Sequence, residues 1–411
     1  MNEVRNYLLL GIFLLLTSCV KNISDNVSTD INSKEFDFVG MMANYADGVI
    51  IPSYERLDTS IKLLGQPGGS IDNYCSSIGS ADEFINLELA RTSWLTSMSN
   101  WQEIETYLIG PIMDNGGSIR NSIYSFFSGS PLSTCAIDQA VVLAEDPTFD
   151  LNSRSFNQRG LDALEYLLFN DNLDHTCPAQ INETQTWNAR SETERRQLRC
   201  DYALDLGDDV GQAVDGLMSS WQPGGENFRS DFVNPSNLST YFQELADALF
   251  YIELKSKDAK LGIPTGIKSD CSQITCPESV ESPYSDTSLE NIRANLVGFR
   301  EFLTGGSGLG FDDIIIQEGF SSVVDNFHQN IEIAIDLIDS MDSSLVEQLD
   351  QLVASGDDSS CLNSAANPDS VQEIPACSLH GFLKRITDSL RTEFIVIVNV
   401  DLPDTAAGDN D

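Results

Sequence analysis

Apolar side chains recur every three or four residues along most of the chain, which is the spacing that places them on one face of an α-helix. The clearest case covers residues 81–108 and ends at Gly110-Pro111, a pair that stops helices. Its stripe consists of Phe84, Leu87, Arg91, Trp94, Met98, Trp101, Glu105 and Leu108. The same spacing predicts helices over 35–64, with a kink or break at Pro52, and over 157–169, 193–221, 228–254, 285–303, 345–353 and 380–398.

Two charged residues, Arg91 and Glu105, fall inside the apolar stripe of 81–108. A charge on a buried face must be paired or must line a cavity, because burying it alone is costly. The alternative is that the stripe drifts around the helix and both side chains extend to solvent. The spacing alone leaves both interpretations open.

No alternating strand-like runs joined by hairpin turns interrupt this pattern. The apolar segment 394–398 has strand-like composition, but its spacing from Phe382 through Ile386 and Leu390 favours a helix. The sequence therefore predicts an all-α protein. Residues 221–225, which contain Pro223 and two glycines, separate two predicted helical bundles packed side by side, 35–221 and 226–402, and an acidic tail, 403–411, follows.

The charge balance is strongly acidic. The 411 residues include 63 Asp or Glu and 23 Lys or Arg, so the formal net charge is −40. Such a polyanion repels phosphate backbones, which excludes nucleic acid as a partner, and it attracts cations and basic proteins. With 41% hydrophobic residues, the chain still has enough apolar side chains for a folded core.

The N-terminus carries the pattern of an export signal. An apolar run from Tyr7 to Leu16 is too short to span a membrane but has the length of a signal-peptide core. The residues 16–19, Leu-Thr-Ser-Cys, look like a bacterial lipobox, which predicts a signal peptide over 1–18, lipidation of Cys19 and a polar tether over 19–34. A plain secretory signal is the alternative. We expect an outer-membrane lipoprotein on the periplasmic side or the cell surface.

Eight cysteines remain after Cys19, and an even number in an exported chain predicts disulfides rather than zinc binding. Sequence alone cannot choose among 105 pairings for eight cysteines. We expect sequential neighbours to pair: Cys75 with Cys135, Cys177 with Cys200, Cys271 with Cys276, and Cys361 with Cys377.

Familiar catalytic motifs are missing from the sequence. The three histidines, His175, His328 and His380, form no HExxH pair, and no GxSxG motif occurs. The glycine-rich stretch at 305–310 lacks the Lys-Ser/Thr of a phosphate-binding loop.

Candidate chemistry concentrates at Asp162 and Glu165. On a helix over 157–169 the two carboxylates are three residues apart and share a face that borders the core stripe. Such a pair could ligate a hard cation, act as an acid/base pair, or dock an arginine. A surface acid pair beside the core is the plain alternative.

At these residues the chain resembles the imelysin family of iron-regulated proteins in bacterial envelopes. The family motif GxHxxE, followed by an aromatic-Leu-Leu run, stands here as 160–168, and the resemblance extends over most of the mature chain. Further matching features, in order along the chain, are Pro52, Trp94 and Trp101 before Gly110-Pro111, the stretches 257–264 and 291–302, and the acidic ending 408–411.

The resemblance implies two helical bundles with the motif near the groove between them, and a link with iron or other metal uptake. Asp162 stands where the family has its histidine, which exchanges a nitrogen ligand for an oxygen ligand and favours hard cations such as iron(III) or calcium. It also removes a base that titrates near neutral pH, so the peptidase activity that the family name implies is not expected.

Three hypotheses follow. The first is a non-enzymatic lipoprotein that binds a metal ion, or a metal-bearing ligand or partner, at Asp162 and Glu165, in contact with metal-uptake proteins of the envelope. The second is an envelope metallopeptidase. The third is an interaction protein in which Glu165 is paired with a buried arginine, Arg91 or Arg159. Arg91, Glu105 and Tyr124 are the candidate neighbours of the carboxylates.

Overall fold

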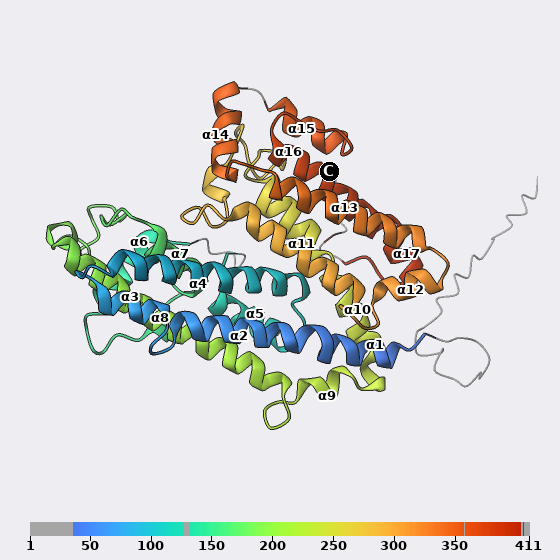
Figure 1. Ribbon diagram of the computed structural model, residues 1–411, viewed down its shortest axis with the longest axis horizontal. Coiled ribbons are helices and arrows are strands. Elements are labelled where there is room, and N and C mark those ends of the chain that lie inside the picture. Colours follow the sequence, from blue (N-terminus) through green and yellow to red (C-terminus); the bar gives the residue numbers. More distant parts are fainter. Residues whose placement is uncertain (1–35, 127–131, 357, 404–405, 407–411) are drawn as a thin grey trace, which may run out of the picture. The chain divides into compact units, whose positions relative to one another are not determined.

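The computed structural model describes residues 36–126, 132–356, 358–403 and 406. The predicted signal peptide, Cys19 and the tether lie outside the described residues, as do 404–405 and 407–411 of the predicted acidic tail. From Phe36 onwards the described residues belong to one compact unit. They form helices and connecting loops with no β-strand among them, so the all-α prediction is confirmed (Figure 1).

The first half of the chain contains eight α-helices and several shorter helical turns within its described residues. The α-helices are α1 (Phe38–Asn44), α2 (Ile51–Gly65), α3 (Ser70–Ser77), α4 (Glu83–Ile104), α5 (Asp114–Ile123), α6 (Thr134–Leu143), α7 (Gly160–Phe169) and α8 (Glu192–Trp221). The shorter elements are the π-helical η2 (Tyr45–Ile50) and the 3₁₀ turns η3 (Glu105–Tyr107), η4 (Gly110–Met113), η5 (Leu151–Ser153), η6 (Phe156–Gln158) and η7 (Trp187–Ala189).

The second half continues in the same way. Its α-helices are α9 (Phe228–Phe232), α10 (Leu238–Ala248), α11 (Ser288–Thr304), α12 (Phe311–Gln317), α13 (Ser321–Asp339), α14 (Leu345–Ser355), α15 (Ser359–Ala366), α16 (Pro375–Ser389) and α17 (Ile395–Val398). Two π-helical segments, η9 (Ile252–Gly262) and η11 (Leu390–Phe394), and two 3₁₀ turns, η8 (Pro235–Asn237) and η10 (Pro277–Ser279), complete it.

Helix α4 lies at the centre of the fold. It contacts α2, α3 and α7 from the first half of the chain and α11 from the second half. Trp94, Met98 and Trp101 of the predicted stripe are fully buried. The approach to α11 is close because Gly298 has no side chain: a Cβ there would lie 2.3 Å from the carbonyl oxygen of Glu103. Helices α4 and α11 thus come from before and after residues 222–225 in the sequence and are in contact. The division into two bundles at these residues stays a prediction.

Two helix predictions can be compared with the structure. Of the kink or break expected at Pro52, the break is wrong: Pro52 lies in the first turn of α2, directly after the π-helical η2, where a missing N–H is tolerated. The expected helix over 228–254 is interrupted at Pro235, which starts the short turn η8 between α9 and α10. Beyond α10 the chain continues as η9, whose Lys260 is fully buried.

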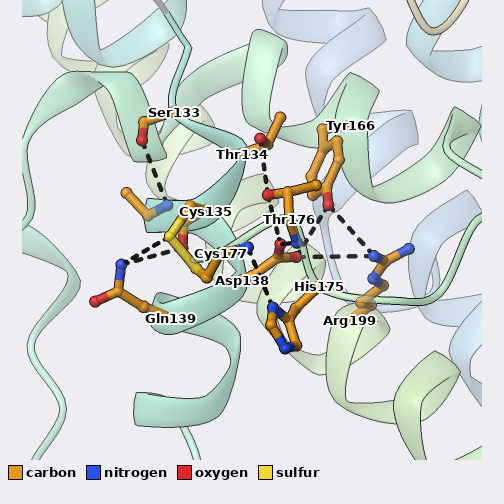
Figure 2. The surroundings of a disulfide bond; sticks show 11 residues. Ser133, Thr134, Cys135, Asp138, Gln139, Tyr166, His175, Thr176, Cys177 and Arg199 are labelled. Atoms are coloured by element: carbon orange, nitrogen blue, oxygen red, sulfur yellow. Dashed lines mark hydrogen bonds and ion pairs between the residues drawn. A yellow bond between two sulfur atoms is a disulfide. The ribbon is translucent and has the colours of Figure 1, made fainter. Parts of the chain in front are cut away.

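The disulfides also differ from the expected sequential pairs. Cys75 pairs with Cys200 and Cys135 with Cys177, whereas the predicted pairs Cys271–Cys276 and Cys361–Cys377 are confirmed. Helices α3 and α8 pack together and bring the Cα atoms of Cys75 and Cys200 to 5.5 Å, although 125 residues separate them in sequence. Figure 2 shows the Cys135–Cys177 bridge beside Asp138.

Candidate functional site

The motif helix α7 begins at Gly160, whose backbone has a φ of +80°. A side chain there would be strained, and its Cβ would lie 2.8 Å from the carbonyl oxygen of Ile123. The glycine therefore lets the helix start directly against the end of α5. Arg159, the preceding residue, pairs with Asp209 of α8 and fixes this end from the other side.

Helix α7 is buried from Gly160 to Leu168, on every face. Trp94 of α4 donates its indole N–H to the carbonyl oxygen of Leu161 at 2.8 Å, which fixes the first turn of α7 against α4. Asp162 is 4% exposed and Glu165 is 2% exposed. The interpretation of the two acids as a surface pair is therefore wrong, because neighbouring helices cover the helix completely.

Asp162 is held by groups that donate hydrogen bonds to it. The hydroxyl of Ser125 donates to Oδ2 at 2.6 Å, and the amide of Ala163 donates to Oδ1 at 3.1 Å. Burial raises the pKa of Asp162 to about 7, and the hydrogen bond from Ser125 opposes that rise. The carboxyl thus changes its charge close to neutral pH.

Glu165 is held by a loop from the second half of the chain. The amides of Tyr284 and Ser285 donate to its Oε1 at 2.9 and 2.8 Å, and the Ser285 hydroxyl donates to the same oxygen at 2.9 Å. Burial raises the pKa of Glu165 to about 7; the three donors lower it and the nearby Asp162 raises it further.

The predicted pairing of Glu165 with Arg91 or Arg159 is wrong. Arg91 donates to the carbonyl oxygen of Leu168 at 2.8 Å and pairs with Glu88 and Asp171 near the surface. The Arg91 side chain is therefore paired and does not extend freely into solvent, but its partners lie near the C-terminal end of α7, away from Glu165. Within the described residues, no basic side chain forms an ion pair with Asp162 or Glu165.

Another acid next to α7 does have a cationic partner. Asp138 accepts hydrogen bonds from Tyr166 and from the amide and hydroxyl of Thr176, and the guanidinium of Arg199 lies 3.7 Å from its carboxylate (Figure 2). Tyr166 follows Glu165 directly in the motif helix. The same helix therefore borders one buried acid with a counter-charge and carries two without one.

A second buried cluster surrounds Lys260 of η9. Its ammonium lies 3.1 Å from Glu281 Oε1 and 3.3 Å from Glu105 Oε2, and it donates to the side-chain oxygens of Gln102 and Asn295. Lys260 and Glu281 are fully buried and Glu105 is 2% exposed. Glu105 is therefore a paired charge within the predicted stripe, and its partner comes from the other half of the chain.

Tyr124 connects the two groups of acids. Its hydroxyl donates to Glu281 Oε1 at 2.9 Å. Burial raises its pKa far above the ordinary value, and Glu281, Glu105, Asp162 and Glu165 all add to the rise. Of the three predicted neighbours, Tyr124 is close enough for the charges of the motif carboxylates to act on it, Glu105 belongs to the Lys260 cluster, and Arg91 lies at the other end of α7.

Four residues of these clusters were not predicted from the sequence: Lys260, Glu281 and the loop residues Tyr284 and Ser285. Lys260 belongs to the stretch 257–264 that resembles the family, which was a usable signal. The loop residues carry no local pattern, because their contribution is mainly two backbone amides supplied to a glutamate 119 and 120 residues away in sequence.

The arrangement can hold a positive charge or a proton. Carboxylate, hydroxyl and carbonyl oxygens are the ligands that hard cations prefer, and Asp162, Glu165 and Ser125 supply the first two kinds. Among the described residues, no three His, Cys, Asp or Glu side chains gather closely enough to form a metal site by themselves. A cation bound at Asp162 and Glu165 would take its remaining ligands from hydroxyls, carbonyls or water.

Comparison with known proteins identifies the family. The sequence profile of the imelysin (peptidase M75) family matches residues 50–368, which is more than half of the chain. The chain belongs to the imelysin family. No curated protein matches it. Within the part of the chain that the structure describes, none of the helices combines the length and apolar character needed to cross a membrane.

Two solved structures share the imelysin fold. An imelysin-like protein from Psychrobacter arcticum 273-4 is 15% identical, with a TM-score of 0.62 over 89% of this chain and 96% of that one. A protein of Parabacteroides distasonis ATCC 8503, described as a "putative iron-regulated protein A precursor", is 16% identical, with a TM-score of 0.57 over 89% and 99% of the two chains. At these identities the likeness concerns the fold alone.

Proposed function

We propose that this imelysin-like chain is a non-enzymatic lipoprotein of the bacterial envelope that binds a metal ion, iron or calcium, or a ligand that carries one, at Asp162 and Glu165. The observation behind the proposal is the absence, among the described residues, of a cationic partner for these two buried carboxylates. Burying carboxylates without a counter-charge is costly, and a bound cation would remove that cost.

The chemistry of the site supports a hard cation. Among the described residues, hydroxyls and backbone amides donate to the two carboxylates, so both groups act as acceptors, as ligating carboxylates do. Asp162 in place of the family histidine adds an oxygen and a negative charge. The iron-regulated name of one structural relative agrees with a role in iron supply.

A titration of the chelator-treated mature protein with Ca²⁺, and with Fe³⁺ supplied as soluble ferric citrate, tests this proposal. We expect one ion to bind at pH 8 and to raise the melting temperature, because a ligand that binds only the folded state stabilises it. Binding should weaken at pH 5, where both carboxyls with a pKa of about 7 hold protons.

The double variant Asp162→Asn/Glu165→Gln should lose the ion and the stabilisation. Asp325→Asn/Glu332→Gln is the matched control, since it replaces two exposed acids of α13 and removes the same two negative charges. The proposal fails if neither ion stabilises the wild type at about 1 mM, or if both variants bind alike. Cleavage of an unfolded protein by the wild type but not by Glu165→Gln would instead assign the metallopeptidase alternative.

The envelope location has its own test. Labelled palmitate should enter the membrane-bound protein in cells and should be lost with Cys19→Ala, which removes the proposed site of lipidation. An unlabelled wild type, released as a soluble secreted protein, would show a plain signal peptide instead.

A further inference from the structure

A pocket of about 190 Å³ opens between residues 105–124 and residues 247–255. Its walls include the apolar side chains Leu108, Met113, Ala248, Phe250 and Leu254. An apolar cavity of about 150 Å³ accommodates benzene, so this pocket has room for a six-membered ring with a small substituent. Neither Asp162 nor Glu165 lines it.

Two cationic side chains, Arg120 and Lys255, line the same small pocket. In a chain with 63 acids and 23 bases, most bases have acidic neighbours. Arg120 is different: its Nε and Nη2 donate to the amide oxygen of Asn121 at 3.0 and 2.9 Å, and among the described residues no carboxylate forms an ion pair with it. Burial lowers the pKa of Lys255; the charge of Glu105 raises it in part, and Arg120 lowers it again, so the two cations of the pocket act on each other.

The acids of the pocket are engaged in other contacts. Glu105 accepts from the Tyr251 hydroxyl at 2.6 Å and pairs with Lys260 behind the pocket wall. Asp247 accepts from the amide of Gln243 at 2.7 Å. The guanidinium of Arg120 therefore faces the pocket without a carboxylate bound to it.

We propose that this pocket binds a small organic carboxylate, with a ring-sized apolar body against Leu108, Met113 and Phe250 and its carboxylate held by Arg120 and Lys255. The apolar walls would bury the body, and the two cations would bind the anionic end by charge-assisted hydrogen bonds. The site is distinct from the proposed metal site, and only Tyr124 lies beside both.

Benzoate is the probe. Calorimetric titration of the mature protein should show saturable binding of one benzoate, and benzamide, its neutral counterpart, should bind at least about tenfold more weakly. Arg120→Gln should weaken benzoate binding by about tenfold or more, because it removes the charge and keeps a similar length. Ala248→Phe should abolish binding by filling the pocket.

Arg293→Gln is the control, since Arg293 pairs with Asp339 on the surface and does not line the pocket. It should keep the wild-type affinity, and circular dichroism should show all variants folded. Equal affinity for benzoate and benzamide, or wild-type affinity in Arg120→Gln, would overturn the role of the cations. No saturable binding of benzoate by the wild type up to about 10 mM would overturn the site itself.

Discussion

The two groups of buried carboxylates that act on Tyr124 each contain two acids but have different surroundings. Glu105 and Glu281 both pair with the ammonium of Lys260, which connects η3 and the loop that contains Glu281 to η9. Among the described residues, the hydrogen bonds to Asp162 and Glu165 come from neutral donors, the hydroxyls of Ser125 and Ser285 and backbone amides. Both groups are equally inaccessible, so the counter-charge is the physical difference between them.

This difference separates a structural role from a binding role. A buried acid that already has a fixed cation contributes to holding the two halves of the chain together, and it has little attraction left for an ion from solution. A buried pair of acids without a fixed cation can still bind a proton or a metal ion. The predictions below test this distinction, beginning with the largest expected effect.

Lys260→Met should destabilise the protein by about 3 to 5 kcal/mol, because it leaves Glu105 and Glu281 buried without a counter-charge. Urea unfolding at pH 7.5 measures the change. Lys62→Met is the control: Lys62 forms an exposed pair with Asp58, and its loss should cost no more than about 1 kcal/mol. Similar losses in both variants would remove the structural role of the Lys260 cluster.

The motif carboxylates should make the metal-free protein less stable as the pH rises. Between pH 5 and 7 the folded state holds protons on groups with pKa of about 7, whereas the unfolded chain, with ordinary values of 3.8 and 4.5, has released most of them. The free energy of unfolding therefore falls from pH 5 to pH 7, by about 2 kcal/mol for each group, and levels off above pH 7.

Asp162→Asn and Glu165→Gln should each flatten this decline, since neither amide titrates. Denaturant unfolding at pH 5, 6, 7 and 8 gives the slope, and the Asp325→Asn/Glu332→Gln control should keep the slope of the wild type. A wild-type slope in both motif variants would contradict the raised pKa of these two acids and their burial without a counter-charge.

Tyr124→Phe should affect the Lys260 cluster. It removes the donor to Glu281 Oε1 at 2.9 Å and leaves the buried carboxylate with one hydrogen bond fewer, for a loss of about 1 to 2 kcal/mol. In double-mutant cycles the effect should couple to Lys260→Met, because both act on Glu281. Strict additivity would place Tyr124 outside the cluster.

Ser285→Ala should have the smallest effect, about 1 kcal/mol, since two backbone amides still donate to Glu165. The loss should be greater at pH 8 than at pH 5, because the hydroxyl stabilises the ionised carboxylate. Ser340→Ala, which removes an exposed local hydrogen bond, should show no such pH dependence.

Much of the fold could be predicted from the sequence. Apolar spacing predicts the stripe of α4, the long helix α8 and the helical segment 395–398. This works because side chains three or four residues apart lie on the same face of a helix. Spacing also placed Asp162 and Glu165 on one helix. It underestimated their burial, because α7 is covered on every face and its polar positions carry no sign of that.

The sequence by itself determined which segments are helical and where the motif lies. It also showed that the eight cysteines after Cys19 are enough to form four disulfides. The tertiary structure alone decided that Cys75 meets Cys200, that Lys260 neutralises Glu105 and Glu281, and that a distant loop binds Glu165. Local spacing reports how one helix divides its faces between core and solvent. Counter-charges and disulfide partners depend on which helices pack together, and those contacts join residues more than a hundred positions apart.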